Sequence, residues 1–155
     1  MNGPTQIHTP ISELSWREQI PIVVLTAALW GEIRSGKLEE IAAVGCAIRN
    51  RRNSGRWGDT WKDVLLFPKQ FSCFNPGNVN EAKMRDPNHS EGPLGRLAWR
   101  RCQAIAQVIM DDVLPDNTGG ATHYLTPEAA ERVHWDDRMM VTRIIGGHIF
   151  LREAT

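Results

Sequence analysis

Two runs of mostly apolar, β-branched residues flank a pair of glycines late in the sequence, and this pattern most limits the folds open to the chain. The runs cover residues 139–145 and 148–151, and Gly146-Gly147 joins them. A two-residue hairpin turn needs positive φ, which glycine adopts at little steric cost. We therefore predict an antiparallel hairpin, with a further short strand over residues 121–125 and a helical turn over 127–132.

The residues that precede this hairpin show helical periodicity. Apolar side chains recur every three or four positions over residues 22–33 and again from residue 38 to 53. Ser35-Gly36 and Ser54-Gly55 mark the expected ends of these two helices. Helices followed by a small antiparallel sheet give an α+β fold, which is the fold class we predict.

Two more helices and one loop are expected in the middle of the chain. A short helix over residues 61–66 begins after Asp59 or Thr60, either of which can cap an N-terminus. Residues 75–93 are rich in Pro, Gly and Asn, so we predict a long loop there. A third main helix is predicted over residues 94–112, with an inward face that contains Leu97, Ile105, Val108 and Ile109.

The length, the cysteines and the charge exclude several classes of protein. The 155 residues predict a single domain over residues 1–155, with residues 1–15 as an extended or poorly ordered lead. The three cysteines are odd in number and lack paired spacing, so we expect reduced thiols without a disulfide framework or a four-cysteine zinc site. The formal net charge of zero gives no strong field, so we expect no nucleic-acid partner. We also expect a monomer.

No segment of the sequence predicts export or membrane insertion. Residues 1–10 lack a basic start followed by an apolar stretch. No run approaches the roughly 20 apolar residues that span a bilayer, so no stable membrane insertion is expected. We expect synthesis in the cytoplasm without a signal peptide, so a substrate outside the membrane is reached only after something else releases the protein.

Glu32 is the strongest candidate for acid–base chemistry. It follows Trp30 and Gly31 near the end of a predicted helix whose apolar stripe includes Leu29 and Ile33. Apolar surroundings disfavour the ionised form of a carboxyl group, so its pKa rises and it can donate a proton near neutral pH. The alternative is a solvated glutamate at a helix terminus, which is the common situation for a charged side chain.

Four short motifs follow one another between residues 25 and 151. They are Gly31-Glu32-Ile33-Arg34 with Ile48-Arg49-Asn50-Arg51, then Pro68-Lys69-Gln70-Phe71-Ser72, Gly119-Gly120-Ala121-Thr122-His123-Tyr124, and Ile145-Gly146-Gly147-His148-Ile149-Phe150. In this order they resemble the blocks of the SleB-type cell-wall hydrolases, the family typified by spore-cortex-lytic enzymes. Four ordered blocks are far more specific than any one of them.

This resemblance implies a lysozyme-like fold, with a helical lobe and a small antiparallel sheet, that forms one catalytic domain. It implies cleavage of the glycan strand of peptidoglycan by a lytic transglycosylase or muramidase reaction, with Glu32 as the catalytic acid and no metal or cofactor. Arg34 matches the same block and is carried over as a substrate-binding residue. The family commonly has glycine and a second glutamate where this chain has Ser35 and Gly36, so a role for that second acid is not carried over.

Glycoside cleavage limits the number of acids that the site requires. Most glycosidases use two carboxyl groups, one as acid and one as base or nucleophile. A lytic transglycosylase needs only one, because the N-acetyl oxygen of muramic acid stabilises the cationic centre and the 6-hydroxyl of that sugar attacks it. We therefore favour transglycosylation over hydrolysis. The other acids that remain candidates for a second carboxyl are Glu39, Glu40, Asp59, Asp63 and Asp136.

Other residues of the four motifs are predicted to contact the sugar chain. Gln70 and Ser72 offer hydrogen bonds to hydroxyl and N-acetyl groups, with Phe71 packed beneath them. His123 and Tyr124 follow small residues that let a ligand approach closely. The alternative for these residues is a structural role in buried turns, and for His148 we expect a role in fixing the hairpin.

Three other functions fit parts of the sequence. A zinc amidase or peptidase would use His123, His134 and His148, although their spacing matches no common zinc motif. A cysteine peptidase would use Cys73 with one of these histidines. A non-catalytic wall-binding module is the third alternative. One short domain without a signal or a wall-binding repeat favours a phage endolysin, which reaches the wall when a holin opens the membrane.

Overall fold

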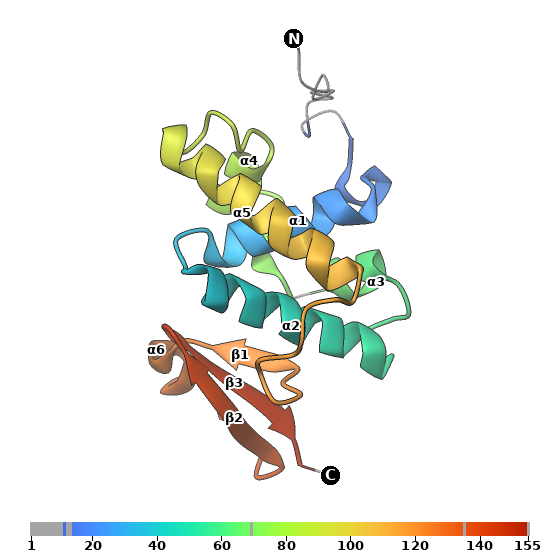
Figure 1. The fold of residues 1–155 in the computed structure, drawn as a ribbon, viewed down its shortest axis with the longest axis vertical. Helices are drawn as coiled ribbons and strands as arrows, with labels where there is room; N and C mark the ends of the chain where they lie inside the picture. Colours follow the sequence, from blue (N-terminus) through green and yellow to red (C-terminus); the bar gives the residue numbers. More distant parts are fainter. Residues whose placement is uncertain (1–10, 12–13, 69, 135, 155) are drawn as a thin grey trace.

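The computed structural model describes residues 11, 14–68, 70–134 and 136–154. Helices form the upper lobe in Figure 1 and a three-stranded sheet forms the lower lobe, with helix α2 at their junction. The elements are, in chain order, η2 (Trp16–Glu18), α1 (Pro21–Ile33), α2 (Leu38–Ser54), α3 (Trp61–Leu65), η3 (Ser72–Phe74), α4 (Val79–Met84), α5 (Gly92–Met110), β1 (His123–Leu125), α6 (Pro127–Ala130), β2 (Met139–Ile145) and β3 (His148–Glu153).

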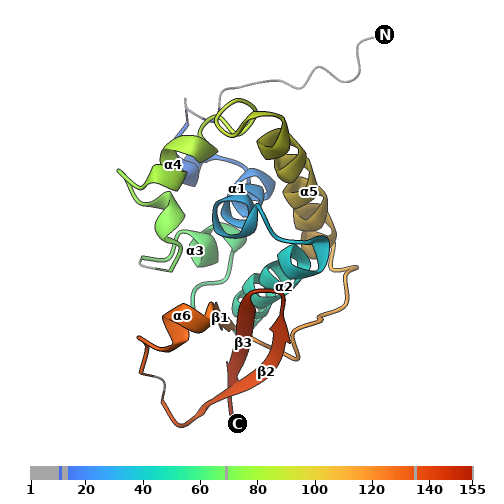
Figure 2. The same ribbon diagram turned by 90° about the vertical axis from the view of Figure 1, so that its left-hand side faces the viewer.

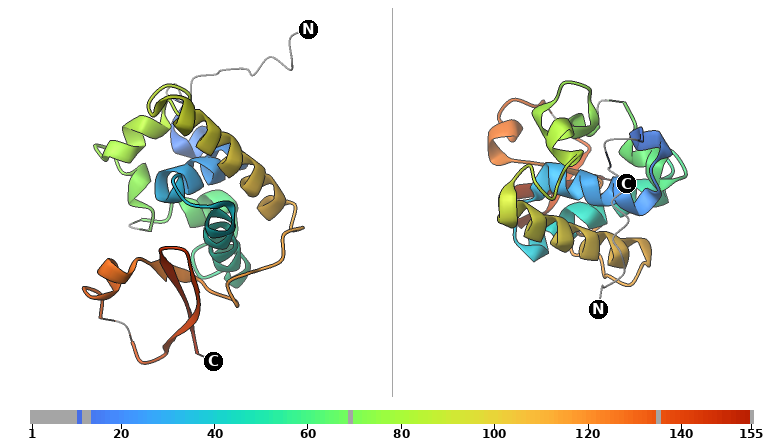
Figure 3. Two further views of the ribbon diagram at one scale, coloured as in Figure 1. Left: turned by 60° about the vertical axis from the view of Figure 1, so that its left-hand side comes forward. Right: turned by 90° about the horizontal axis from the view of Figure 1, so that it is seen from above.

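Helix α1 is the centre of the helical lobe. It begins at Pro21, which suits the first helical turn because that position needs no N–H donor. Most of its side chains are buried, and helices α2, α3, α4 and α5 all pack against it. Figure 3 shows α5 lying along it. A helix that is apolar on nearly every side belongs in a core. The last turn of α1, which contains Glu32, therefore lies inside the molecule.

Helices α2 and α3 confirm the predicted end and start signals. Gly55 follows α2 with a φ of 72°, the left-handed conformation that glycine adopts at helix ends. The Thr60 hydroxyl accepts a hydrogen bond from the N–H of Asp63 at 3.1 Å and so caps α3. Gly45 in the middle of α2 lets α5 approach, because a Cβ there would lie 3.0 Å from Ile109.

The segment 75–93, predicted to be a long loop, contains helix α4. The Asn78 side chain accepts a hydrogen bond from the N–H of Asn80 at 2.8 Å and caps this helix. Met84, at its end, is fully buried, and its Sδ lies against Gly31 of α1. The prediction was wrong here because an asparagine cap and one buried anchor outweigh a composition that disfavours helix.

Helix α5 begins at Gly92 rather than at residue 94. Of the residues predicted to face inward, Ile109 is buried and Ile105 and Val108 are half-buried. The buried residues are Gly95, Ala98, Cys102, Ala106 and Ile109. Leu97, predicted to face inward, is 45% exposed. Small side chains let α5 lie close to α1, where the Trp30 indole N–H donates to the Gly95 carbonyl at 3.1 Å. The prediction assigned the largest apolar residues to the contact, and close packing of these helices requires small ones.

The sheet confirms the predicted hairpin. Strands β2 and β3 pair antiparallel with Ile145 opposite His148, so Gly146-Gly147 forms a two-residue turn. Gly146 has a φ of 57°, and a positive φ at the first central residue is typical of a type II′ turn. Strand β1 pairs with the other edge of β3, which gives the order β1-β3-β2. Figure 2 shows the hairpin turn beside the start of α2.

The molecule has the α+β, lysozyme-like arrangement expected from the sequence. Phe150 of β3 and Ala121 join the same apolar cluster as α1 and α2, so the sheet packs on the helical lobe through α2. The three cysteines are free and buried, as predicted. The lead predicted for residues 1–15 lies mostly outside the described residues; Ser15, which is described, caps η2 through hydrogen bonds with Glu18.

Candidate functional site

Glu32 lies half-buried in the last turn of helix α1. Burial raises the pKa of its carboxyl group, and this effect outweighs a hydrogen bond from the Cys73 thiol and the positive charges of His148 and Arg51. Those groups come from η3, β3 and α2, so the carboxyl is enclosed by both lobes. A carboxyl that stays protonated to higher pH than a free glutamate is suited to donate a proton.

Gly31 explains how η3 reaches this carboxyl. A Cβ at position 31 would lie 2.9 Å from the Cβ of Cys73, closer than side chains approach one another. The missing side chain therefore lets Cys73 lie against the end of α1, beside Glu32. The glycine of the first motif is thus explained by packing as well as by its place next to the acid.

Arg51 joins the separate motifs into one site. It is 6% exposed; its Nε donates to the Thr122 carbonyl at 2.5 Å and its Nη1 donates to Oε1 of Gln70 at 3.1 Å. The guanidinium also lies over the rings of Trp57 and Phe71, at 5.0 and 5.5 Å from their centroids. Burial lowers the pKa of Arg51, and electrostatic interactions with Tyr124 and Glu32 oppose this shift. A cation held this way fixes the segment 70–71 against the start of β1.

Tyr124 and His123 place β1 in the same group of side chains. The Tyr124 ring packs edge-on against His148, with centroids 5.8 Å apart. Burial, and then the charge of Glu32, raises the pKa of the Tyr124 hydroxyl well above its usual range, so it stays a neutral donor. His123 meets the Thr122 hydroxyl at 3.0 Å and the Trp57 ring at 5.6 Å. Burial, and then the charge of Arg51, lowers the pKa of its ring.

The structure brings together most of the predicted site residues, but not all of them. Glu32, Gln70, Phe71, His123 and Tyr124 belong to the connected group described above. The Ser72 side chain is exposed at the start of η3, and Lys69 of the same motif lies outside the described residues.

Arg34 is held apart from this group. It donates to Asn80 at 3.1 Å and pairs with Glu91 at 3.2 Å, and its guanidinium lies over the Trp30 ring. Residues two apart on a helix do not share a face, so Arg34 ties α1 to α4 and α5 while Glu32 faces the sheet lobe.

None of the groups that act on the pKa of Glu32 within the described residues is a carboxylate. The candidates for a second carboxyl are engaged elsewhere or exposed. Glu40 binds the hairpin turn, Asp63 pairs with Arg17 at 3.0 Å and Asp136 pairs with Arg138 at 2.9 Å. The remaining two, Glu39 and Asp59, are exposed. Among the described residues, no second carboxylate therefore acts directly on the pKa of Glu32.

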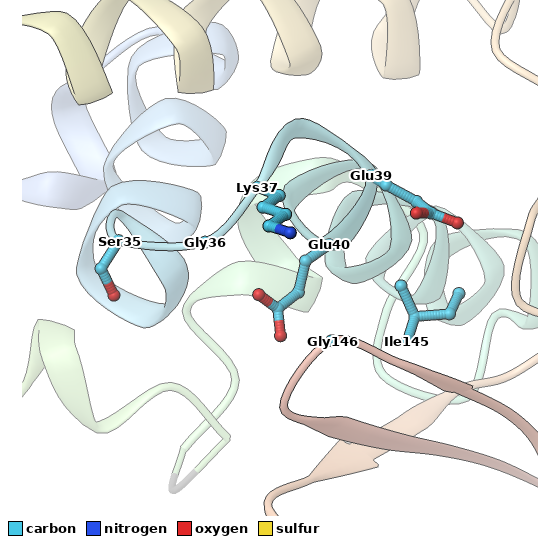
Figure 4. Close-up of a pocket in the computed structure, with 7 residues that line it drawn as sticks. All are labelled: Ser35, Gly36, Lys37, Glu39, Glu40, Ile145 and Gly146. Carbon is cyan, nitrogen blue, oxygen red and sulfur yellow. The ribbon is translucent and has the colours of Figure 1, made fainter.

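A pocket of about 350 Å³ lies next to this group. Figure 4 shows that it opens between the α1–α2 connection, the first turn of α2 and the hairpin turn. Its lining residues are Ser35, Gly36, Lys37, Glu39, Glu40, Ile145 and Gly146. The pocket thus borders the segment that follows Glu32.

The geometry bears on the zinc and cysteine alternatives. In the part of the chain that the structure describes, no three His, Cys, Asp or Glu side chains gather as a metal-binding group. Burial, and then the charge of Glu32, raises the pKa of the Cys73 thiol. A nucleophilic cysteine needs the opposite shift, so this thiol is suited to donate a hydrogen bond. No helix in the described ranges has the length and apolar character needed to cross a bilayer.

Sequence reasoning gave no site role to two residues that the structure places there. Arg51 belongs to the second half of the first motif, so its position in a matching block was the available signal. Cys73 was weighed only as a nucleophile, and no sequence signal places its thiol beside Glu32, because that contact depends on the packing of η3 at Gly31.

Comparison with known protein families gave one match. A family model described as cell wall hydrolase matches residues 35–151. The match contains the segment 70–72, the pair His123-Tyr124 and the hairpin, and it begins directly after the turn of helix that carries Glu32 and Arg34. Neither the curated proteins nor the solved structures contain a significant match.

Proposed function

Since the chain belongs to the cell wall hydrolase family, of the SleB type, it acts on peptidoglycan, and we propose that it cleaves the glycan strand as a lytic transglycosylase. In this proposal Glu32 is the only acid and base. The single observation that carries it is the half-buried Glu32 carboxyl, whose pKa is raised by burial and whose neighbours in the described residues include no second carboxylate.

The reaction needs one proton donor that later becomes an acceptor. Glu32 protonates the glycosidic oxygen as the bond from C1 of muramic acid breaks, and the N-acetyl oxygen of that sugar bonds to C1 in its place. The 6-hydroxyl then attacks C1, displaces the N-acetyl oxygen and returns its proton to the Glu32 carboxylate. No water is consumed, and the product is a 1,6-anhydromuramic end.

Neighbouring side chains supply contacts for the sugar chain. We assign the neutral hydroxyl of Tyr124 to a hydrogen bond near the N-acetyl group, because it lies within the electrostatic reach of Glu32. Gln70 has its carbonyl oxygen taken by Arg51, so its NH₂ group is the end that donates to the sugar. His123 and Ser72 form the flanking surface, and buried Phe71 packs beneath it. Arg34 supports the end of α1 from the far side.

Mass spectrometry of digested peptidoglycan tests the proposal. Anhydromuramic ends are expected from the wild-type protein, and Glu32→Gln is expected to release none. Reducing ends would replace transglycosylation by a muramidase reaction that uses water. Free stem peptides would overturn glycan cleavage in favour of an amidase or peptidase, and release of nothing would favour a wall-binding module.

The place of action is a separate proposal. We carry forward the expectation that the protein is made in the host cytoplasm and reaches the wall after a membrane lesion, as a phage endolysin does. Expression in bacteria with and without a holin tests it. Lysis is expected only when both proteins are present, and lysis by the chain alone would contradict the proposal.

A further inference from the structure

The carboxylate of Glu40 holds the turn of the β2–β3 hairpin against the first turn of helix α2. Its Oε2 accepts hydrogen bonds from the Gly147 N–H at 2.6 Å and from Nδ1 of His148 at 3.0 Å. Figure 4 shows the carboxylate directed at the turn beside Gly146. Glu40 is 9% exposed, so these bonds form largely away from water, where an unpaired polar group is costly.

Gly146 allows this close approach. A Cβ at position 146 would lie 2.9 Å from Oε1 of Glu40 and nearer still to Oε2. Glycine is thus required here twice, once for its positive φ and once for the carboxylate that packs against it. A glutamate drawn this close to a turn indicates a contact with a specific role.

His148 connects Glu40 to the proposed catalytic acid. An ionised carboxylate only accepts hydrogen bonds, so Nδ1 of His148 carries the hydrogen that Glu40 receives. This fixes the tautomer of the neutral ring and its orientation. The same ring packs against Tyr124 and interacts electrostatically with Glu32. One imidazole therefore binds the carboxylate on α2 and acts on the carboxyl group on α1.

We propose that Glu40 is a positioning residue for wall cleavage, which holds the hairpin turn and thereby presents the His148 ring to the Glu32 carboxyl. The inference rests on the proposed function for the role of Glu32. The hydrogen bonds of Glu40 are independent of that role, so the two can fail separately.

The charges around these groups predict the direction in which the pKa of Glu32 should shift when Glu40 is replaced. Burial opposes ionisation of Glu40, but hydrogen bonds from His148 and Gly147 and the charges of His148 and Lys37 hold its pKa below the usual value. The interaction with His148 lowers the pKa of Glu32, so a ring that moves away from Glu32 lowers it less. The other charged or titratable groups that act on Glu32 are Arg51, Cys73 and Tyr124.

Glu40→Gln separates an effect through His148 from a direct effect of charge. Loss of a nearby negative charge by itself favours ionised Glu32 and moves the alkaline limb of the pH–rate profile to lower pH. Displacement of the His148 ring weakens an interaction that lowers the pKa of Glu32, and it moves the limb to higher pH. We expect the shift to higher pH, measured by turbidity loss of permeabilised bacteria. No shift, or a shift to lower pH, would overturn the proposal.

Two further variants control this measurement. Glu39→Gln removes the same charge from the neighbouring, exposed side chain and is expected to keep the wild-type limb. In a His148→Asn background Glu40→Gln should no longer shift the limb upward, because the intermediary is gone. An upward shift that persists without His148 would contradict positioning through the ring.

Amide hydrogen exchange at Gly147 gives a readout that does not depend on activity. Glu40→Ala removes the acceptor and should speed exchange at this amide, whereas Glu40→Gln keeps an amide oxygen there and should slow exchange relative to Glu40→Ala. We expect Glu40→Ala to lower the cleavage rate by up to about 10²-fold, as small misplacements of catalytic groups do. Unchanged exchange in Glu40→Ala would overturn the anchoring role, while full activity of Glu32→Gln would overturn only the proposed function.

Discussion

The end of helix α1 and the start of helix α2 each withdraw a glutamate from solvent, yet the two carboxyl groups behave in opposite ways. The pKa of Glu32 is raised by burial, which outweighs the hydrogen bond with Cys73 and the electrostatic interactions with His148 and Arg51. The pKa of Glu40 is lowered although burial acts on it too, because it receives hydrogen bonds from the Gly147 N–H and the His148 ring and lies near Lys37. The balance between burial and the hydrogen bonds that reach each carboxyl separates the two roles.

This contrast shows how one short stretch of chain can hold an acid and an anchor. A carboxyl with few donors keeps its proton and remains available for transfer, whereas a carboxyl with several donors is ionised and structural. Glu39, beside the anchor but exposed, serves neither purpose. Variants that exchange or remove these donors test the contrast.

Replacing the proposed acid should give the largest effect. Glu32→Gln keeps the shape of the side chain but cannot donate the proton, so the cleavage rate should fall about 10²–10⁴-fold. Loss of turbidity by permeabilised bacteria measures the rate, with thermal unfolding as a check that the variant is folded. Retention of the wild-type rate would remove Glu32 from the mechanism and leave the two carboxyl groups functionally alike.

Disturbing the anchor through the turn should be the next largest effect. Gly146→Ala places a side chain against the Glu40 carboxylate at a φ of 57° and should lower the free energy of unfolding by about 1–3 kcal/mol. Gly77→Ala is the matched control, since Gly77 also has a positive φ of 82° but nothing lies within 4 Å. Urea unfolding compares them, and an equal loss in both variants would show that the carboxylate contact adds no cost.

The two glutamates should affect stability at opposite ends of the pH range. Because the pKa of Glu32 is raised, its stabilising contribution is fully present when the pH is below the usual pKa of 4.5. This contribution is lost as the pH rises through the raised pKa. The contribution of Glu40 is present above 4.5 and is lost as pH falls through the lowered value. The stability of Glu32→Gln relative to wild type should therefore increase as the pH rises. The stability of Glu40→Gln relative to wild type should increase as the pH falls.

Melting temperatures measured from acidic to neutral pH test these slopes. Slopes of the same sign for both variants would mean that the two environments do not differ as described.

Changing the Cys73 thiol, which donates to Glu32, should have the smallest effect. Cys73→Ala removes the thiol that opposes the raised pKa of Glu32, so the alkaline limb of activity should move to higher pH, by less than about one unit for one hydrogen bond. Cys73→Ser substitutes a stronger donor and should move the limb the other way. Both variants should cleave the wall, and loss of activity in Cys73→Ala alone would revive the cysteine peptidase alternative.

The sequence predicted the elements whose signals are local. Gly55 ends α2 and Gly146-Gly147 closes the hairpin, because each depends on a backbone angle that glycine alone adopts readily. Helix α4 and the small-residue face of α5 were mispredicted, since both depend on what packs against them. Met84 finds its place only beside Gly31 of α1.

The candidate site divides in the same way. The sequence pattern and the family resemblance predicted Glu32, Gln70 and Tyr124 as site residues, and in the structure these residues surround Arg51. The separation of Arg34 from this group follows from its ion pair with Glu91, a partner distant in sequence. Contacts of this kind depend on the tertiary fold, which helical periodicity and motif spacing do not specify.

The strand order β1-β3-β2 has a consequence for biosynthesis. The middle strand is the last of the three to leave the ribosome, and in the described residues it is the partner of both others. A nascent chain that ends before residue 148 can form its helices but not its sheet, and it lacks the imidazole beside Glu32. Assembly of the complete site therefore waits until residues 148–153 have been translated.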